Sequence, residues 1–378
     1  MLTRPEENGV KALPEDRARG ALDRLALPAN AAVILAVSGG GDSIALMHMA
    51  HDHLAARRPD VRLVAATVDH GLRAASADEA RHVARTCQTL GIGHVTLRWD
   101  ADVPAAGMQD AARQARYALL TELATKHRSP IVLTGHTADD QAETVAMRAA
   151  RAEEGRGLAG IDEAALSARR IWFVRPFLHI GRRDLRDWLA AHGHDWIDDP
   201  SNDDRHFERV RMRAALAHDP QRRDALLAKA AHHAESRRRT AMQGAACIDD
   251  RTIWCKTEDG ARFDPSGAAG MSGAAMTAAM AAELAWTGRL PRLADAARAE
   301  RALAFCRTAP NGAGLTLAGC RLDKRGGTVA IAPEPRNRRA ACERLFDRLL
   351  PSADWPLAGA LACLHGTPPF PPPPFTNR

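Results

Sequence analysis

One short segment of the sequence has the residue types of a phosphate-binding loop. It lies between an apolar run and a helical pattern, and its residues are Ser38, Gly39, Gly40, Gly41, Asp42 and Ser43. Glycines allow backbone N–H groups to close around an anion, serine hydroxyls add donors, and the N-terminus of the following helix carries partial positive charge. No lysine of the chain follows a glycine, so the lysine of a Walker A loop is missing. We therefore predict a phosphate cradle that is poorly suited to transferring a γ-phosphoryl group.

Asp42 is an acid inside this predicted anion site. A carboxylate has a clear use there if it holds a divalent cation shared with phosphates, which is the usual arrangement for Mg²⁺. The alternative is structural, because Asp42 and Ser43 could merely cap the helix that begins at this point.

A second group of polar residues follows the fourth apolar run of the chain. The segment GHTADDQAET covers residues 135–144 and includes His136, Asp139, Asp140 and Glu143. A carboxylate at such a place can hold Mg²⁺, a substrate ammonium or a proton. The alternative is a helix cap in which Asp139 or Asp140 pairs with Glu143 in a capping box.

Basic side chains accompany these two segments. His70 follows the second apolar run, and Arg113 and Arg116 lie three residues apart on one face of a predicted helix. The two arginines are either solvated at the surface or in contact with phosphates. His70 either packs at the end of the strand without a functional role or takes part in the site.

A further basic cluster consists of Arg205, Arg209, Arg211 and Arg213. Arg209 and Arg213 share a helical face at i and i+4, where like charges repel unless an anion lies between them. An RNA phosphate backbone would supply that anion, whereas a solvated, arginine-rich helix is the alternative.

Five apolar segments, each followed by a helical pattern, must position these residues. We expect strands at residues 31–38, 62–69, 94–99, 130–135 and 171–176, and helices at about 42–57, 75–91, 107–127, 138–150 and 181–192. This alternation predicts an α/β fold with a doubly wound, parallel, five-stranded sheet. Ligands of such sheets bind beyond the carboxyl ends of the strands, where the polar segments lie.

The character of the sequence changes after residue 200 and suggests further parts. We expect an N-terminal extension (1–25), a catalytic domain (26–215), a helical linker (216–243), a smaller second domain (244–350) and a proline-rich tail (351–378). Two apolar runs within residues 316–336 indicate a hairpin. Residues 368–375 are typical of polyproline II, as a disordered end or a weak docking ligand.

The composition of the chain is that of a soluble globular protein with an excess of arginine. Its 378 residues include 52 basic and 46 acidic side chains, a formal net charge of +6. The excess is either an electrostatic footprint for nucleic acid or a coding bias that replaces lysine by arginine. No apolar run is long enough to span a membrane and no secretory signal is evident, so we expect a cytoplasmic protein without a membrane partner. The seven cysteines form no CxxC pair, which indicates reduced thiols.

Four blocks of the sequence, in order and spacing, resemble the N-type ATP pyrophosphatases, the PP-loop family. They are SGGGDS (38–43), VDHGLR (68–73), ARQARY (112–117) and GHTADDQAET (135–144). Within that family they are most similar to the enzymes that form lysidine in tRNA. RPF (175–177) and DDPSN (198–202) extend the likeness to about residue 215, and GCRL (319–322) is a weaker match to the same enzymes. The resemblance implies an adenine nucleotide alpha hydrolase-like fold.

The resemblance also implies a reaction in two steps with ATP and Mg²⁺. The C2 oxygen of the wobble cytidine (position 34) of an isoleucine tRNA with anticodon CAU attacks the α-phosphorus of ATP and releases pyrophosphate. The ε-amine of free L-lysine then attacks the adenylated base, AMP leaves, and lysidine remains. The second domain would contact the tRNA, and the protein is either a monomer or a homodimer.

The same resemblance gives roles to the residues above. It implies that the loop binds ATP, that Asp42, Asp139, Asp140 and Arg116 are catalytic, and that Asp42 and Asp139 hold Mg²⁺. Candidates for contacts with tRNA or lysine are His70, Arg113, His136, Glu143, Arg209 and Arg213. The chain departs from the family's usual pattern at Ala152-Glu153-Glu154 and at Val210.

Three rival functions stay open at this point. A PP-loop enzyme that thiolates tRNA would need cysteines at the site, and only Cys87 lies in the predicted catalytic domain. An amidating enzyme would need an ammonia source, for which we see no domain. A non-catalytic RNA-binding relative would need only a basic face.

Overall fold

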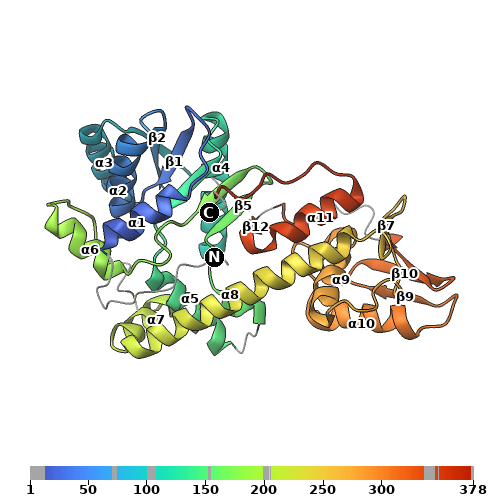
Figure 1. Cartoon of the computed structure of the whole chain (residues 1–378). Helices are drawn as coiled ribbons and strands as arrows, with labels where there is room; N and C mark the ends of the chain where they lie inside the picture. Colours follow the sequence, from blue (N-terminus) through green and yellow to red (C-terminus); the bar gives the residue numbers. More distant parts are fainter. Residues whose placement is uncertain are drawn as a thin grey trace. The chain divides into compact units, whose positions relative to one another are not determined.

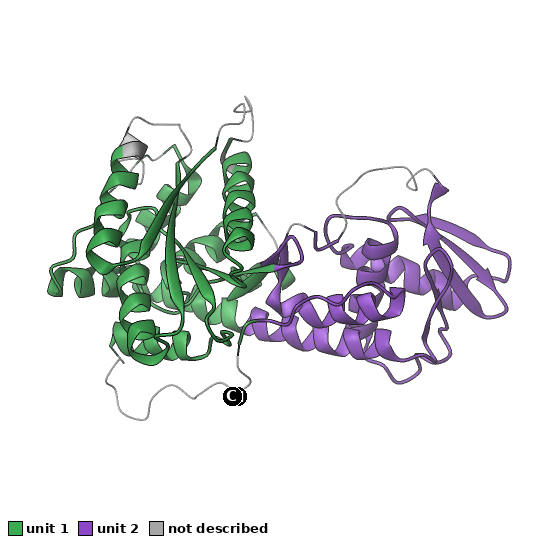
Figure 2. Ribbon diagram, turned by 90° about the horizontal axis from the view of Figure 1, so that it is seen from above, with its two compact units in different colours: residues 1–165, 171–231, 374–378 green, residues 166–170, 232–373 purple. Residues whose placement is uncertain are grey.

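The computed structural model describes residues 13–69, 75–99, 108–151, 155–198, 204, 206–335, 345–347 and 349–375. The chain divides into two compact units (Figure 2). Unit 1 comprises residues 1–165, 171–231 and 374–378, and unit 2 comprises residues 166–170 and 232–373. One of the boundaries between the units falls within the helix α8 (Pro220–Asp249), which contains most of the segment expected as a helical linker.

The five predicted parallel strands are present in the main sheet. They are β1 (Ala32–Ala36), β2 (Arg62–Asp69), β3 (Gly93–Arg98), β4 (Ile131–Thr134) and β6 (Ile171–Val174). The paired strands β1 and β2 are labelled in Figure 1. Their order is β6-β4-β1-β2-β3, and each neighbouring pair among them is parallel. The predicted doubly wound α/β sheet is therefore confirmed.

The predicted strand number, five, was wrong because the sheet has seven strands. The full order is β12-β5-β6-β4-β1-β2-β3, with β5 at Ala164–Ser167 and β12 at Leu349–Pro351. β5 turns tightly into β6 through Ala168 and Arg169, both at positive φ. Neither residue is the glycine or asparagine that usually signals such a turn. β12 has three residues, which is too short for a periodic pattern to show.

Within the described residues, seven helices of unit 1 accompany the sheet besides the first part of α8. They are α1 (Pro14–Asp23), α2 (Gly41–Arg57), α3 (Ala75–Leu90), α4 (Met108–Lys126), α5 (Ala138–Ala150), α6 (Arg182–Ala191) and α7 (Glu208–Ala217), with a short 3₁₀ helix at Gly155–Ala159. The central strand β1 is apolar throughout because it is covered on both faces, and Val33, Ile34 and Leu35 are fully buried.

The order of the strands determines where a ligand can bind. From β1 the chain runs through β2 to β3 on one side of the sheet and then crosses back to β4 on the other side of β1. The strand order therefore reverses between β1 and β4, and a crevice opens at their carboxyl ends. The glycine-rich loop follows β1, and GHTADDQAET follows β4. The fold therefore brings the two sequence segments together.

Unit 2 has its own antiparallel sheet and helices. The strand order is β7-β8-β11-β10-β9, with β7 at Trp254–Lys256, β8 at Ala261–Phe263, β9 at Gly314–Leu317, β10 at Cys320–Arg325 and β11 at Thr328–Pro333. The β10–β11 hairpin confirms the predicted one, and its turn uses Gly326 and Gly327 at positive φ. Its helices, besides the second part of α8, are α9 (Gly273–Thr287), α10 (Ala296–Thr308) and α11 (Trp355–His365), with a 3₁₀ turn at Ser352–Asp354.

The proline-rich tail is ordered up to residue 375, so the expectation of a disordered end was wrong. Phe370 is buried, the Trp355 indole donates to the Pro371 carbonyl at 3.0 Å, and Phe375 forms a β-bridge with Leu25.

Six cysteines in the described part of the chain are free thiols, and Cys342 lies outside it. No helix in the described ranges combines the length and apolarity that crossing a membrane requires.

Gly135 permits the close approach on which the crevice depends. A Cβ at this position would lie 2.9 Å from the Asp42 carbonyl oxygen and 3.1 Å from the Ser43 Cα. Because these are backbone atoms, Gly135→Ala should displace the start of α2 and destabilise the fold by about 1–3 kcal/mol in urea unfolding. Gly20→Ala is the matched control. Its Cβ would meet nothing within 4 Å, so alanine should stabilise α1 by up to about 1 kcal/mol. Equal effects of the two substitutions would contradict this account.

Candidate active site

The glycine-rich loop forms a closed turn between β1 and α2. Gly39 has a φ of +91°, a conformation that favours glycine. The Ser38 backbone N–H donates to Ser43 Oγ at 3.2 Å, and that hydroxyl donates to the Gly40 carbonyl at 2.9 Å. α2 begins at Gly41, and its N-cap, Gly40, has no side-chain cap. The alternative that Asp42 and Ser43 merely cap this helix is therefore wrong, and the helix N-terminus is open to an anion.

A cavity of about 380 Å³ lies against this loop, entirely within unit 1. Its other walls come from α4, from the segment that leads into α5, and from α6. They include Arg113, Arg116, His136, Asp140, Arg182 and Arg186. The volume falls in the usual range for small-molecule sites.

Asp42 is the acid of the loop and has one oxygen without a partner. Its Oδ2 accepts a hydrogen bond from Arg182 Nε at 3.0 Å, whereas its buried Oδ1 has no partner. Burial raises the pKa of this carboxyl group to about 6, against the influence of Arg182. A buried, unpartnered carboxylate oxygen beside an anion cradle fits a divalent cation, so Asp42 is the residue that would hold Mg²⁺ here.

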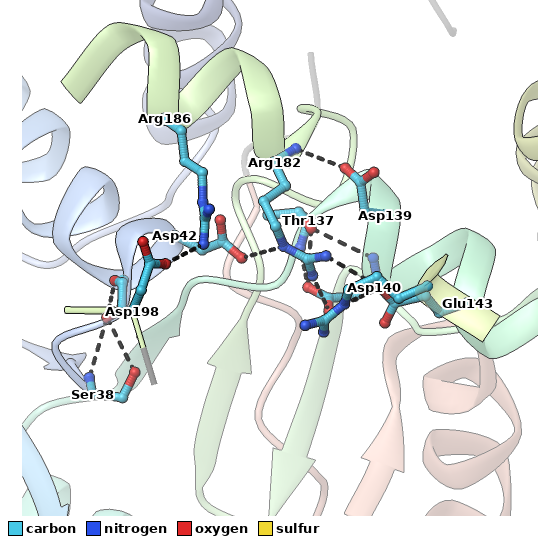
Figure 3. A network of polar contacts seen from close by, with 12 residues as sticks. Ser38, Asp42, Thr137, Asp139, Asp140, Glu143, Arg182, Arg186 and Asp198 are labelled. Atoms are coloured by element: carbon cyan, nitrogen blue, oxygen red, sulfur yellow. Dashed lines mark hydrogen bonds and ion pairs between the residues drawn. The ribbon is translucent and has the colours of Figure 1, made fainter. Parts of the chain in front are cut away.

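Arg182 joins three acids from two helices (Figure 3). Besides Asp42, its guanidinium donates to Asp140 Oδ1 at 2.9 Å and to Glu143 Oε1 at 3.1 Å. Its backbone N–H, in the first turn of α6, donates to Asp139 Oδ2 at 2.7 Å. α2, α5 and α6 are thus connected through one residue.

Glu143 is the most buried acid of this group, with 2% of its side chain exposed. It accepts from Arg182, from Arg209 Nε at 2.7 Å and from Arg213 Nε at 2.9 Å. The anion between the i and i+4 arginines of α7 is therefore Glu143 in this structure.

Asp139 and Asp140 are adjacent in sequence but differ in surroundings. Thr137 is the N-cap of α5, and Asp140 completes the capping box with it, so the predicted pairing of an aspartate with Glu143 was wrong. Asp140 also lines the cavity, where its Oδ1 faces Arg182 and Arg209. Asp139 is not among the cavity-lining residues, and its Oδ1 lies 3.3 Å from Arg223 Nε.

The remaining candidates lie along α4 and β4. His136 Nδ1 forms a hydrogen bond of 3.0 Å with Thr134 Oγ1. Burial, with Arg175 nearby, lowers the pKa of the ring to about 3, so the ring is neutral near pH 7. Arg113 Nη2 donates to the Tyr117 hydroxyl at 3.2 Å, and Arg175 Nη2 donates to the same oxygen at 3.1 Å.

Some of the predicted residues cannot be placed in the site. His70, Arg205, residues 152–154 and residues 199–203 lie outside the described residues.

The sequence analysis missed three arginines that lie at or near the site, Arg182, Arg186 and Arg223. The only signal for the first two was their place after the fifth strand, on the helix at the same rim of the sheet.

Known proteins match the part of the chain that contains this cavity. The PP-loop domain family matches residues 15–219. The chain is 49% identical to the tRNA(Ile)-lysidine synthase of Mesorhizobium japonicum over 189 residues, which cover 49% of this chain and 42% of that protein. It is 46% identical to the one of Rhizobium meliloti over 195 residues (49% and 43%). It is 42% identical to the one of Brucella melitensis biotype 2 over 224 residues (59% and 50%).

The chain spans about half the length of these curated relatives. Among solved structures it is similar to the U34-tRNA thiolase NcsA from Methanococcus maripaludis. That likeness has a TM-score of 0.49 and 16% sequence identity, and it covers 58% of this chain and 77% of that one.

The raised pKa of Asp42 predicts a pH-dependent cost in stability. The pKa of Asp42 is about 6 in the folded state and 3.8 ordinarily, so the folded protein binds this proton more tightly than the unfolded one. The free energy of unfolding therefore falls as pH rises from about 4 to 6. The asparagine of Asp42→Asn does not titrate. The unfolding free energy of the wild type should therefore fall relative to Asp42→Asn by about 3 kcal/mol between pH 4 and pH 7.

Urea unfolding at several pH values measures this difference. Adding Mg²⁺ at pH 7 should reduce the difference in unfolding free energy between the wild type and Asp42→Asn, because a cation stabilises the ionised carboxylate and not the amide. Parallel stability curves for the two proteins would contradict both the buried charge and the cation site.

Proposed function

Because the chain belongs to the PP-loop domain family, we propose that it uses ATP to join lysine to the wobble cytidine of an isoleucine tRNA with anticodon CAU, forming lysidine. The supporting observation is that relatives named tRNA(Ile)-lysidine synthase are 42–49% identical to it over about half of the chain. The family match, residues 15–219, includes every residue that lines the cavity.

In the first step, the loop holds the pyrophosphate part of ATP. In this proposal, backbone N–H groups at the start of α2 and the hydroxyls of Ser38 and Ser43 donate hydrogen bonds to the leaving pyrophosphate. The C2 oxygen of cytidine attacks the α-phosphorus, and the bond to the bridging oxygen of pyrophosphate breaks. Mg²⁺ held by Asp42 would neutralise charge on the phosphates.

In the second step, the ε-amine of lysine attacks C2 of the adenylated base and AMP leaves. The amine must first lose a proton, and Asp140 is the acid that can hold the ammonium and accept that proton in the cavity. Although burial alone would raise its pKa, Arg182 and Arg209 lower it, so Asp140 is ionised near pH 7. Glu143, held by the arginines of α6 and α7, fixes the surroundings of Asp140.

The tRNA must present an unstacked cytidine to this cavity. Arg113 and Arg116 line it from α4 and are the side chains we assign to phosphates of the anticodon loop. His136 is neutral, so it can accept or donate a hydrogen bond without adding charge.

The rival thiolation chemistry has less support. A thiolate is the reactive form of cysteine, and none of the residues that line the cavity is a cysteine. Cys87 is fully buried, contacts Met47, and has its pKa raised to about 11 by burial. A non-catalytic RNA-binding role would not need the unpartnered oxygen of Asp42.

Incubating the protein with isotope-labelled lysine, ATP, Mg²⁺ and a CAU-anticodon isoleucine tRNA transcript tests the proposal. Nuclease digestion and mass spectrometry should find one labelled lysidine per tRNA, dependent on ATP. The same tRNA with a different wobble base is the control. Absence of labelled lysine from a folded, ATP-binding protein would refute the proposal.

Replacing each of the two aspartates separates the half-reactions. Asp140→Asn should slow lysine incorporation at least about 100-fold, because general-base catalysis contributes that much, while pyrophosphate is still released and adenylated tRNA accumulates. Asp139→Asn is the neighbouring control and should have a smaller effect, since Asp139 does not line the cavity. Equal loss in both variants would contradict the assignment to Asp140.

A further inference from the structure

The guanidinium of Arg186 is a cation of the cavity whose donors are mostly unused. Arg186 lies one turn after Arg182 on α6 and lines the cavity together with the glycine-rich loop. Its single hydrogen bond within the described residues runs from Nη2 to Asp198 Oδ1 over 2.7 Å. Its Nε–H is buried and has no partner. Since a buried donor without an acceptor is costly, the position is suited to a missing acceptor.

The neighbouring cations are already paired. Arg182 uses Nε, Nη1 and Nη2 for three different carboxylates. Arg209 and Arg213 are bound to Glu143 and, in the case of Arg209, also to Asp140. Of the arginines on α6 and α7 that surround the acids, Arg186 is therefore the one that keeps most of its donors for a ligand.

Arg186 also lies directly against the start of α2. Its Cγ is 3.5 Å from where a Cβ on Gly41 would be, and the Trp196 ring is 3.4 Å from the same point. The guanidinium lies over the Trp196 ring, 5.9 Å from its centroid. The Ile197 N–H donates to the Gly39 carbonyl at 2.9 Å and fixes the segment that carries Trp196 and Asp198 to the loop. In Figure 3, Arg186 extends from α6 toward Asp42 and Asp198.

We propose that Arg186 binds the pyrophosphate part of ATP in the loop and that Trp196 and Asp198 position its guanidinium for this. The loop lacks the lysine with which a Walker A loop meets phosphates, and Arg186 supplies a cation at that place from another element. A planar guanidinium can donate two parallel hydrogen bonds to phosphate oxygens, whose negative charge grows as pyrophosphate leaves. The inference rests on the proposed function only in taking ATP as the substrate.

Binding of inorganic pyrophosphate with Mg²⁺, measured by calorimetry without tRNA or lysine, tests the proposal. Arg186→Gln should weaken this binding about 10- to 100-fold, the usual loss for a hydrogen bond between charged groups. Arg183→Gln is the matched control on the same helix. Its side chain is 93% exposed, pairs with Asp187 and does not line the cavity, so binding should stay unchanged.

Two further variants separate direct contact from a structural effect. Arg186→Lys should recover part of the binding, because it restores the charge without the bidentate geometry. Asp198→Asn should weaken binding by a smaller factor than Arg186→Gln, because it releases the guanidinium without removing it. Thermal unfolding of each variant confirms that the fold is kept.

The proposal is overturned if Arg186→Gln binds pyrophosphate like the wild type or like Arg183→Gln, or if the wild type does not bind pyrophosphate. Failure of the wild type to make lysidine would instead refute the proposed function, and the pyrophosphate measurement would still decide the role of Arg186. The two failures are therefore distinguishable.

Discussion

The candidate site depends on one side chain, Arg182, which places a single positive charge among three carboxylates. Without it, Asp42 would lose its hydrogen-bond partner beside Asp140 and Glu143, which keep Arg209 and Arg213, and removing one partner of such a buried group is strongly destabilising. The same bonds fix α6 to the helices that follow β1 and β4. The crevice between these strands is therefore held together by residues of the chain itself.

Arg182 also gives two acids of the site different properties. It satisfies one oxygen of Asp42 and leaves the other buried and unpartnered, so burial dominates and the pKa of Asp42 is raised. Asp140 accepts hydrogen bonds from Arg182, Arg209 and the Thr137 backbone N–H, so its pKa is lowered despite burial. Two carboxylates whose pKa values are moved in opposite directions are suited to different tasks. The lowered pKa keeps Asp140 ionised, which suits it to hold the ammonium group of lysine, whereas the unpartnered Oδ1 of Asp42 is what fits a cation.

The parts of the site that the sequence predicted are those with local signals. The glycine-rich loop, the five parallel strands and the acids after β4 each have a pattern within ten residues, and the topology of a doubly wound sheet then brings them together. Arg182 and Glu143 could not be paired in advance, because their contact joins residues 39 positions apart and no periodicity encodes it. The three-residue strand β12 was missed for a related reason: its place in the sheet is set by tertiary packing and not by a local pattern.

The arginine excess of the sequence has a different meaning once the pairs are known. Arg182, Arg209 and Arg213 neutralise acids of the site, and in unit 2 Arg237 pairs with the buried Asp354. Because these arginines are paired with acids, they raise the number of basic residues without adding to the net charge of +6 or to the cationic surface available to an RNA. The cavity is also lined by Arg186 on α6 and by Arg113 and Arg116 on α4. Arg186 adjoins the loop that we propose to hold pyrophosphate, and the proposed function assigns the α4 pair to phosphates of the RNA. In that proposal, arginines of different helices bind ATP and RNA.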